Sequence, residues 1–274
     1  MRISEVRCRS ALTGRGGSYT LNPYVGCTHM CAYCYASYIS RWKGESDPWG
    51  TWVHVKVNVP EVLKKELSRP SFLGDTSVFL STVCDPYQPL ERRYGLTRRC
   101  LEVLSEGARA GTLKVTLATK SDLVLRDLDL LRSFPEGSLR LAFSITTYRD
   151  EIASKLEPFS PRPSRRIAAA RALKEAGLKV GFFVCPVLPY ITEMDLKGIL
   201  DLSEELGLDF ASFDTLNYLK GHIRGRTFRA YRTLGDEALR RLQYAKDAPG
   251  YVAELREHIL EEASGRGIDV EVLF

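Results

Sequence analysis

Short apolar runs alternate along this 274-residue chain with longer segments in which apolar residues recur every three or four positions. Apolar runs between turn residues are typical of strands buried on both faces, and the longer pattern is typical of helices that cover a sheet. The predicted strands are 18–22, 77–81, 114–119, 140–145, 179–185, 210–214 and 269–274, and residues 53–58 are predicted to be strand-like or extended. The predicted helices are 60–67, 97–110, 123–132, one from about 150, 164–176, 193–206, 236–246 and 250–265.

A strand followed by a helix recurs six times between residues 18 and 235. Such βα repeats predict an α/β fold with a parallel sheet and right-handed crossovers. Six strands are fewer than the eight of a closed barrel, so we expect a partial barrel. Residues 1–17 are polar, end in glycines and predict a loose lead-in, and residues 236–274 predict a helical extension packed on the barrel. We expect a single domain overall.

Composition narrows the class of protein without identifying it. Hydrophobic residues make up 44% and charged residues 27%, and the net charge is +5. This small positive excess is compatible with an anionic partner but is also ordinary. Neither an apolar run long enough to cross a bilayer nor a leader pattern is evident. Seven cysteines, an odd number, indicate a reducing compartment, and we expect a cytoplasmic protein.

Three of those cysteines lie within eight residues, in the stretch Asn22-Pro23-Tyr24-Val25-Gly26-Cys27-Thr28-His29-Met30-Cys31-Ala32-Tyr33-Cys34-Tyr35. The spacing C-x3-C-x2-C predicts that Cys31 and Cys34 share one face of a turn that leads into a helix, with Cys27 reaching in from a loop. Three thiolates can bind three corners of a [4Fe-4S] cluster. One iron then has no protein ligand and is open to a chelating small molecule.

Two other interpretations of the motif remain open at this point. His29 lies between the first two cysteines, so Cys27, His29, Cys31 and Cys34 could instead bind one zinc ion in a non-catalytic nucleic-acid-binding module. Structural zinc usually joins two separated pairs of ligands, and no second pair is present. The three thiols could also be buried core groups, although such cysteines usually scatter, as Cys8, Cys100 and Cys185 do.

The motif, placed just after a short strand, resembles the radical S-adenosylmethionine (SAM) superfamily. The resemblance implies an open (βα)6 partial barrel of the TIM type, a [4Fe-4S] cluster, and SAM chelated to the free iron. It also implies an oxygen-sensitive enzyme. One electron from a flavodoxin- or ferredoxin-type donor would split SAM into methionine and a 5′-deoxyadenosyl radical, which abstracts hydrogen from a substrate.

Polar residues follow the ends of successive predicted strands, where parallel sheets collect ligands. Asp85 could accept hydrogen bonds from the SAM ammonium group, Lys120 could neutralise its carboxylate, and the hydroxyls of Ser144 and Thr146 could bind its ribose. Each has a structural alternative. Asp85 precedes a proline and could be a turn residue, Lys120 could be a solvated cation, and the hydroxyls could bind backbone.

Within the superfamily, the chain resembles the spore photoproduct lyase-like branch over about residues 19–206. The motifs that carry this are Asn22-Pro23-Tyr24, Cys31-Ala32-Tyr33-Cys34-Tyr35, Asp85-Pro86-Tyr87-Gln88-Pro89 with Glu91, Thr119-Lys120-Ser121, Ser144-Ile145-Thr146-Thr147, Glu157-Pro158, Pro163-Ser164-Arg165-Arg166 and Pro186-Val187-Leu188-Pro189. The resemblance implies that Asp85, Lys120 and Ser144 contact SAM, and that Tyr33 and Tyr35 return the radical to it.

The chain departs from that branch at one position. The lyases have a hydrogen-donating cysteine shortly before the acidic residue, and Thr82 occupies the matching position here, while Cys84 directly precedes Asp85. Reversal of spore photoproduct is therefore in doubt. Cys84 could still donate hydrogen, or it could be a small buried hydrophobe.

A basic segment follows the sixth predicted strand. Residues 216–234 contain no acid, and between 218 and 232 cations alternate with aromatic rings. Arg224, Arg226 and Arg229 could hold phosphates there while the rings stack on bases, which predicts a nucleic acid substrate. The alternatives are a solvated loop, and a radical SAM enzyme that acts on a peptide or small metabolite. No membrane partner is expected.

Overall fold

The computed structural model describes residues 1–69, 72, 75–111, 113–216 and 219–274. It divides into two compact units, and each is described by itself. The first unit contains residues 1–29, 36–142 and 175–179, and the second contains residues 30–35, 143–174 and 180–274. The chain passes between the units within the cysteine motif, so Cys27 belongs to the first unit and Cys31 and Cys34 belong to the second.

Two groups of strands make up the centre of the first unit. Strands β2 (Leu12–Arg15), β3 (Ser18–Leu21), β6 (Thr76–Leu80) and β7 (Leu113–Thr119) are neighbours in the order β7-β6-β3-β2. All of these pairs are parallel except β2 with β3. A smaller sheet has the order β1-β5-β4, from Arg2–Val6, Trp52–Lys56 and Tyr24–Val25. Parallel pairing at β3, β6 and β7 aligns the carboxyl ends of these three strands.

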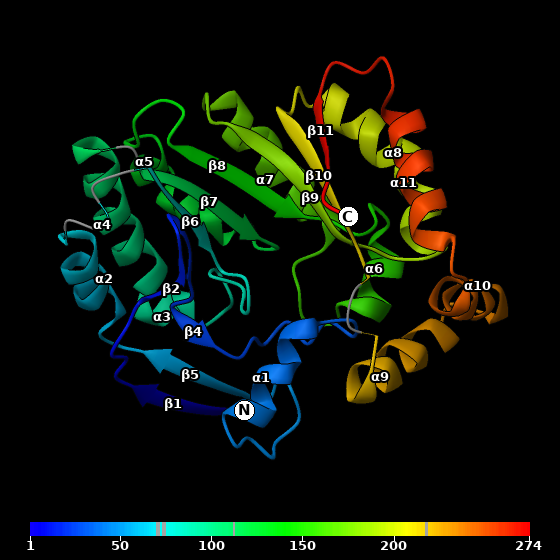
Figure 1. Ribbon diagram of the computed structural model, residues 1–274, viewed down its shortest axis with the longest axis horizontal. Coiled ribbons are helices and arrows are strands. Elements are labelled where there is room, and N and C mark those ends of the chain that lie inside the picture. Colours follow the sequence, from blue (N-terminus) through cyan, green and yellow to red (C-terminus); the bar gives the residue numbers. More distant parts are fainter. Residues whose placement is uncertain (70–71, 73–74, 112, 217–218) are drawn as a thin grey trace. The chain divides into compact units, whose positions relative to one another are not determined.

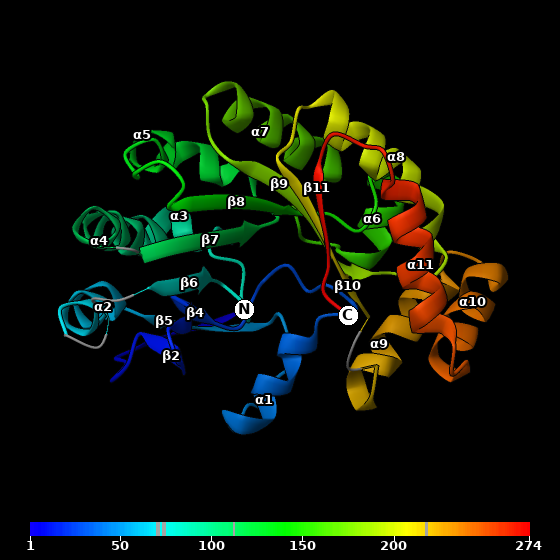
Figure 2. The same ribbon diagram turned by 45° about the horizontal axis from the view of Figure 1, so that its top comes forward.

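Helices α2 (Val59–Leu67) and α4 (Leu96–Ala110) lie side by side in this unit, and α4 packs on β7 (Figures 1 and 2). Leu101, Leu104 and Ala108 of α4 are buried, as their spacing of three and four residues predicts. The remaining elements are short: η1 (Tyr35–Tyr38), α1 (Ile39–Trp42), α3 (Glu91–Tyr94), η3 (Asp122–Asp127) and α5 (Leu128–Leu131).

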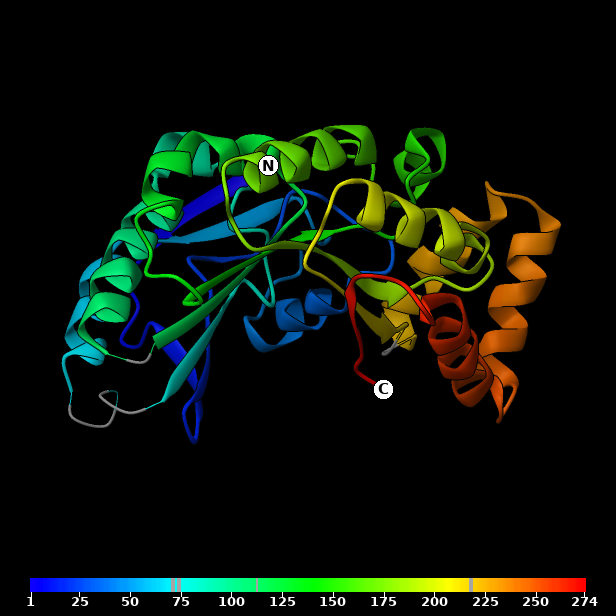
Figure 3. The same cartoon turned by 90° about the horizontal axis from the view of Figure 1, so that it is seen from above.

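The second unit has a parallel set of strands, β9 (Val180–Val187), β10 (Phe210–Thr215) and β11 (Asp269–Val272). Strand β8 (Leu139–Ser144) has its first four residues in the first unit and its last two in the second. The helices are α6 (Asp150–Leu156), α7 (Pro163–Glu175), α8 (Ile191–Glu205), α9 (Gly221–Arg232), α10 (Asp236–Asp247) and α11 (Tyr251–Ala263). Helix α8 lies beside α11, and α9 beside α10 (Figure 3).

The predicted strands and helices from residue 18 onward are present, most with ends within a few residues, although a 3-10 helix occupies the first part of 123–132. One expectation and one alternative are wrong. Residues 1–17 are not a loose lead-in, because Arg2–Val6 and Leu12–Arg15 form strands that pair with β5 and β3. The basic segment is not a loop, since Gly221–Arg232 is helical. Asn217 and Tyr218, the start of that segment, lie outside the described residues. Among the described helices, none has both the length and the apolar character needed to cross a membrane.

Candidate functional site

The first unit holds the part of the cysteine motif that contains Cys27. Gly26, directly before it, has φ +94°, and a Cβ there would lie 2.6 Å from the carbonyl oxygen of Trp52, so only glycine fits. The buried Gln88 side chain reaches both sides of Cys27. Its Nε2 donates to the Gly26 carbonyl at 3.2 Å, and its Oε1 accepts from the Thr28 amide at 3.2 Å. Gln88 thereby fixes the backbone on either side of this thiol.

The second unit holds the part that contains Cys31 and Cys34. The amide of Cys34 donates to the carbonyl of Cys31 at 3.2 Å, and the amide of Ala32 donates to Leu156 at the end of α6 at 2.8 Å. Cys31 and Tyr33 pack into a core cluster with residues of α6, α8, α9 and α10. The two thiols therefore lie in one turn, as their spacing predicts, and the helix expected there begins only after Cys34.

Tyr33 is buried, and its hydroxyl donates to the carboxylate of Glu157. Glu157 also pairs with the guanidinium of Arg166, and both of these side chains are at most 1% exposed. Burial, with Glu157 beside it, raises the pKa of Tyr33 well above its ordinary value. Arg166 also donates to the Ser144 carbonyl at 3.0 Å, so this network joins the cysteine motif to the end of β8.

The other candidate residues of the second unit have different surroundings. The Thr146 hydroxyl donates to Glu157 at 3.4 Å, and the Thr146 carbonyl accepts from the Thr192 hydroxyl at 2.6 Å. Ser144 and Thr146 are both buried. Tyr35 is 45% exposed, in contrast to the enclosed Tyr33. The two tyrosines suggested by the sequence therefore occupy unlike environments.

Asp85 connects the ends of β6 and β7 in the first unit. Its Oδ1 accepts from the Tyr87 amide at 2.9 Å and from the Thr119 hydroxyl at 2.8 Å, and its Oδ2 accepts from the Lys120 amide at 2.7 Å. His29 of the cysteine motif lies with Nδ1 3.5 Å from the same Oδ2. The structure thus brings Asp85, Lys120 and His29 together, and the proximity of Asp85 to Lys120 was expected from their positions after neighbouring strands.

Cys84 lies beside this carboxylate in sequence and near the start of the cysteine motif in space. Its sulfur is 3.6 Å from the Ser81 hydroxyl and 3.7 Å from Oδ1 of Asn22. Burial raises the pKa of the Cys84 thiol to about 11. Cys84 therefore keeps its hydrogen at neutral pH. Its neighbour Ser81, the first residue after β6, has φ +77°, a left-handed conformation that is costly for a residue other than glycine.

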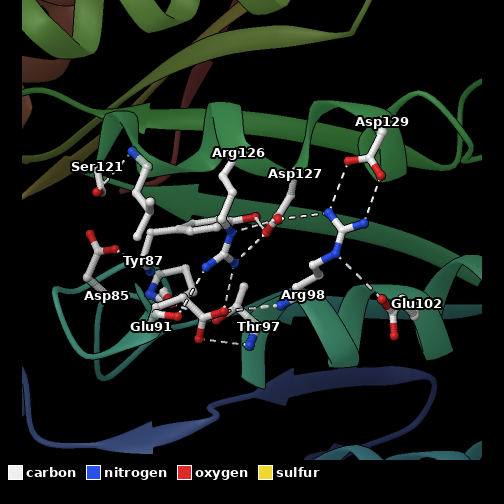
Figure 4. A network of polar contacts seen from close by, with 12 residues as sticks. Asp85, Tyr87, Glu91, Thr97, Arg98, Glu102, Ser121, Arg126, Asp127 and Asp129 are labelled. Atoms are coloured by element: carbon white, nitrogen blue, oxygen red, sulfur yellow. Dashed lines mark hydrogen bonds and ion pairs between the residues drawn. The ribbon is translucent and has the colours of Figure 1, made fainter. Parts of the chain in front are cut away.

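A buried ionic network supports the segment from Asp85 to Glu91 (Figure 4). The Tyr87 hydroxyl donates to Asp127 at 3.0 Å, and Arg126 contacts both Asp127 and Glu91. Figure 4 shows the Arg126 guanidinium between these two carboxylates, which are fully buried. Glu91 in addition accepts from the hydroxyl of Tyr24 at 2.5 Å. The network fixes the loop after β6 to the strand that precedes Cys27.

The three arginines suggested as substrate contacts lie on α9, and they differ in exposure. Arg224 and Arg229 are exposed, whereas Arg226 is half-buried. The Nη2 of Arg226 donates to the carbonyl of Cys34 at 3.1 Å. Burial lowers the pKa of the Arg226 guanidinium, and the nearby Cys34 and Cys31 thiols oppose that shift. Arg226 is therefore directed toward the cysteine motif, and Arg224 and Arg229 are accessible to solvent.

The donor set fits an iron–sulfur cluster. Cys27 and Cys31 are buried, and Cys34 is half-buried. Among the described residues, no three Cys, His, Asp or Glu side chains are grouped as ligands of one metal ion. A zinc ion needs its ligands around one centre, whereas in a [4Fe-4S] cluster each cysteine binds a different iron. Three cysteines at the spacing C-x3-C-x2-C suit the second arrangement.

These features define an α/β protein with a sulfur-rich motif after a strand and polar groups at the strand ends. The sequence profile of the Radical SAM superfamily matches residues 21–203, and the chain belongs to this family. It is therefore a radical SAM enzyme, for which a [4Fe-4S] cluster, SAM and a reductant are the cofactors and partner that the family requires. The interpretation as a zinc-stabilised, non-catalytic module is wrong.

The curated relatives do not identify a substrate. The chain is 34% identical over 180 residues to an uncharacterised protein of Methanocaldococcus jannaschii, covering 66% of this chain and 64% of that one. It is 36% identical over 200 residues to an uncharacterised protein of Mycobacterium tuberculosis, covering 69% and 57%. The chain thus matches less than two thirds of the length of either relative.

Solved structures agree on the fold. A spore photoproduct lyase complexed with dinucleoside spore photoproduct is similar with a TM-score of 0.71 and 19% identity, covering 99% of this chain and 82% of that one. Streptococcus suis SuiB bound to precursor peptide SuiA is similar with a TM-score of 0.59 and 16% identity, covering 93% and 48%. The predicted fold class, an α/β fold of the radical SAM partial-barrel type, is confirmed.

Sequence reasoning assigned no role to several residues that the structure places around the motif. Gln88 and Glu157 stand inside motifs that carried the family resemblance, but neither spacing nor residue type showed that they contact the cysteine segment. Thr227 donates to the carbonyl of Ala32 at 3.2 Å from α9. Helix α9 could have been predicted from the sequence, because Ile223, Thr227 and Tyr231 follow one another at intervals of four. In the structure all three are buried.

Proposed function

We propose that Cys27, Cys31 and Cys34 are the three protein ligands of the [4Fe-4S] cluster in this radical SAM enzyme. One observation carries the proposal: buried or half-buried side chains fix the backbone around both parts of the motif. Gln88 does so around Cys27, and Thr227 and Arg226 do so between Cys31 and Cys34. Ligands held before metal binding lose little conformational freedom when the cluster is inserted.

Asp85, Lys120, Ser144 and Thr146 are the proposed SAM contacts. Oδ1 of Asp85 already accepts two hydrogen bonds and Oδ2 accepts one, which leaves acceptor capacity on Oδ2 for an ammonium group. Lys120 supplies a cation for a carboxylate, and its backbone is fixed by Asp85. When bound, the cluster and SAM together supply a 5′-deoxyadenosyl radical that abstracts hydrogen from the substrate.

Tyr33, Tyr35 and Cys84 are the proposed hydrogen or radical carriers. Tyr33 has a proton acceptor, Glu157, at its hydroxyl, and a phenol must release a proton when it is oxidised. Cys84 remains a thiol, the form from which a hydrogen atom can be donated. Tyr35 is accessible from solvent. Thr82 keeps the reversal of spore photoproduct in doubt, and the proposed activity is hydrogen abstraction from a nucleic acid in repair or modification.

The exposed cations of α9 support a nucleic acid over a peptide or small metabolite. Arg224 and Arg229 lie on one helix, and the Arg224 guanidinium lies 5.1 Å from the centre of the Phe228 ring. Cations beside rings suit phosphates and bases. A flavodoxin- or ferredoxin-type protein is the proposed electron donor. The seven cysteines, an odd number, suit a reducing compartment such as the cytoplasm.

Binding and isotope transfer together test the substrate class. We expect affinity for single- or double-stranded oligonucleotides to fall with salt, with a logarithmic slope of about −0.9 per phosphate contact on duplex DNA. The double variant Arg224→Ala/Arg229→Ala should reduce that slope, and the exposed Arg132→Ala should not. Deuterium should pass from a deuterated oligonucleotide into 5′-deoxyadenosine. Transfer from a deuterated peptide or small metabolite, with salt-independent or absent oligonucleotide binding, would contradict the proposal.

A further inference from the structure

Helix α9 contacts the cysteine motif with two consecutive side chains. The Thr227 hydroxyl lies 3.2 Å from the carbonyl of Ala32, and Nη2 of Arg226 donates to the carbonyl of Cys34 at 3.1 Å. These carbonyls flank the turn that contains Tyr33 and ends at Cys34. The contact lies on the buried face of α9, which Ile223, Thr227 and Tyr231 form in the second unit.

Arg226 is the arginine of this helix that faces the motif. Arg224, Arg229 and Arg232 are exposed, while Arg226 is half-buried. Its guanidinium is also near enough to the thiols of Cys31 and Cys34 to interact with them electrostatically. An arginine stays charged in a protein, so this site carries a fixed positive charge. Because the guanidinium is partly buried, its charge is screened less than it would be in water.

We propose that Arg226 is a positioning residue that sets the reduction potential of the cluster, a role separate from substrate binding. The inference rests on the proposed ligation by Cys31 and Cys34. Reduction adds one electron to the cluster and makes it more negative. A fixed cation beside two of its ligands stabilises the reduced form more than the oxidised form, which raises the potential. A higher potential makes electron transfer from the physiological donor more favourable.

The hydrogen bond from Arg226 also keeps the cation in place. A guanidinium anchored on the Cys34 carbonyl cannot swing to solvent without losing that bond, whereas the exposed arginines of α9 are free to meet phosphates. One basic segment therefore has two tasks. Its exposed cations are available to substrate, and Arg226 acts on the cluster.

The test is an anaerobic redox titration of the reconstituted full chain, without SAM, followed by electron paramagnetic resonance of the reduced cluster. The variants are Arg226→Gln, Arg226→Met and Arg226→Lys, with Arg232→Gln as the control on the same helix. Two neutral variants are used because either one could fold poorly. Iron and sulfide content are measured in each, so that potentials are compared only between fully loaded proteins.

We expect the neutral variants to have a lower midpoint potential than the wild type, and Arg226→Lys and Arg232→Gln to stay close to it. A neutral variant that loads its cluster and keeps the wild-type potential would overturn the inference, as would a fall in Arg226→Lys equal to that in Arg226→Gln. A wild-type protein that takes up no cluster would instead overturn the proposed ligation, so the two failures are distinguishable.

Discussion

Tyr33, in the middle of the cysteine motif, donates its hydroxyl hydrogen to Glu157, a buried carboxylate that also pairs with Arg166. The two residues are 124 positions apart in sequence. Their contact fastens the turn between Cys31 and Cys34 to the segment after α6. Arg166 remains paired with Glu157 when the tyrosine is replaced.

This arrangement makes the effects of two substitutions unequal. Tyr33→Phe removes one hydrogen bond to a charged group and should lower the free energy of unfolding by about 1.5–3 kcal/mol. Glu157→Gln leaves the buried Arg166 cation without its counterion and should cost about 3–5 kcal/mol. Urea unfolding of the cluster-free protein measures both. Glu205→Gln, in an exposed pair with Arg171, is the control and should stay within about 0.5 kcal/mol. Equal losses for Glu157→Gln and Glu205→Gln would contradict the network.

Gln88 should control how firmly the cluster is held. Gln88→Met keeps the length of the side chain but removes its bonds to Gly26 and Thr28, so the backbone around Cys27 is less restrained. Loss of a residue that orients a ligand typically weakens metal binding by about 10-fold or more. We expect iron to pass to a chelator about tenfold faster than in the wild type. Gln243→Met, on α10, should not change the rate, and equal rates in the two variants would exclude the role of Gln88.

Asp85 should be required for SAM affinity. Asp85→Asn removes the negative charge proposed to meet the ammonium group, and one charge-assisted hydrogen bond of about 1.5–3 kcal/mol corresponds to roughly tenfold to a hundredfold in affinity. Equilibrium dialysis with the reconstituted protein measures this. Thr119→Val removes one hydrogen-bond donor to Asp85 but leaves the charge of Asp85 in place. This variant therefore distinguishes loss of structural support for Asp85 from loss of the charge proposed to bind SAM. Asp75→Asn, exposed before β6, should bind normally. Wild-type affinity in Asp85→Asn would remove this residue from the SAM site.

Cys84 should react slowly with alkylating reagents until the pH is high. Its pKa lies at about 11, raised from 9.0 by burial, so its thiolate fraction at pH 8 is about a hundredfold smaller than that of an ordinary thiol. Peptide mapping after iodoacetamide treatment, with free glutathione as reference, follows the rate. We expect the rate at Cys84 to keep rising above pH 10. A plateau below pH 9 would show that the thiol ionises readily and is a poor reservoir of hydrogen.

The fold was largely predictable because its strands and helices carry strong local patterns. The strand around Val53 alternates apolar and polar residues, and Pro60 marks the start of α2. Strands β1 and β2 were missed because their side chains are mostly exposed, and their stability comes from pairing with β5 and β3. Pairing with a strand some fifty residues away, as between β1 and β5, leaves no signal in a local pattern.

The candidate site was predictable in its residue types and not in its supports. Cysteine spacing identified the motif, and positions after strands identified Asp85 and Lys120, whose proximity the structure confirms. The bonds from Gln88 and Arg226 to backbone carbonyls depend on three-dimensional contacts, and such bonds require no particular sequence spacing. The roles of Asp85, Lys120, Ser144, Thr146, Tyr33, Tyr35 and Cys84 stay predictions, as do the domain boundaries.

Anaerobic reconstitution with iron and sulfide, followed by dithionite and SAM, tests the ligation of the cluster most directly. We expect about four irons per chain and 5′-deoxyadenosine that appears only with the reductant, and we expect Cys31→Ala to abolish the nucleoside while the half-buried Cys8→Ala or the buried Cys100→Ala does not. A Cys31→Ala protein that still forms 5′-deoxyadenosine would contradict the proposed ligation.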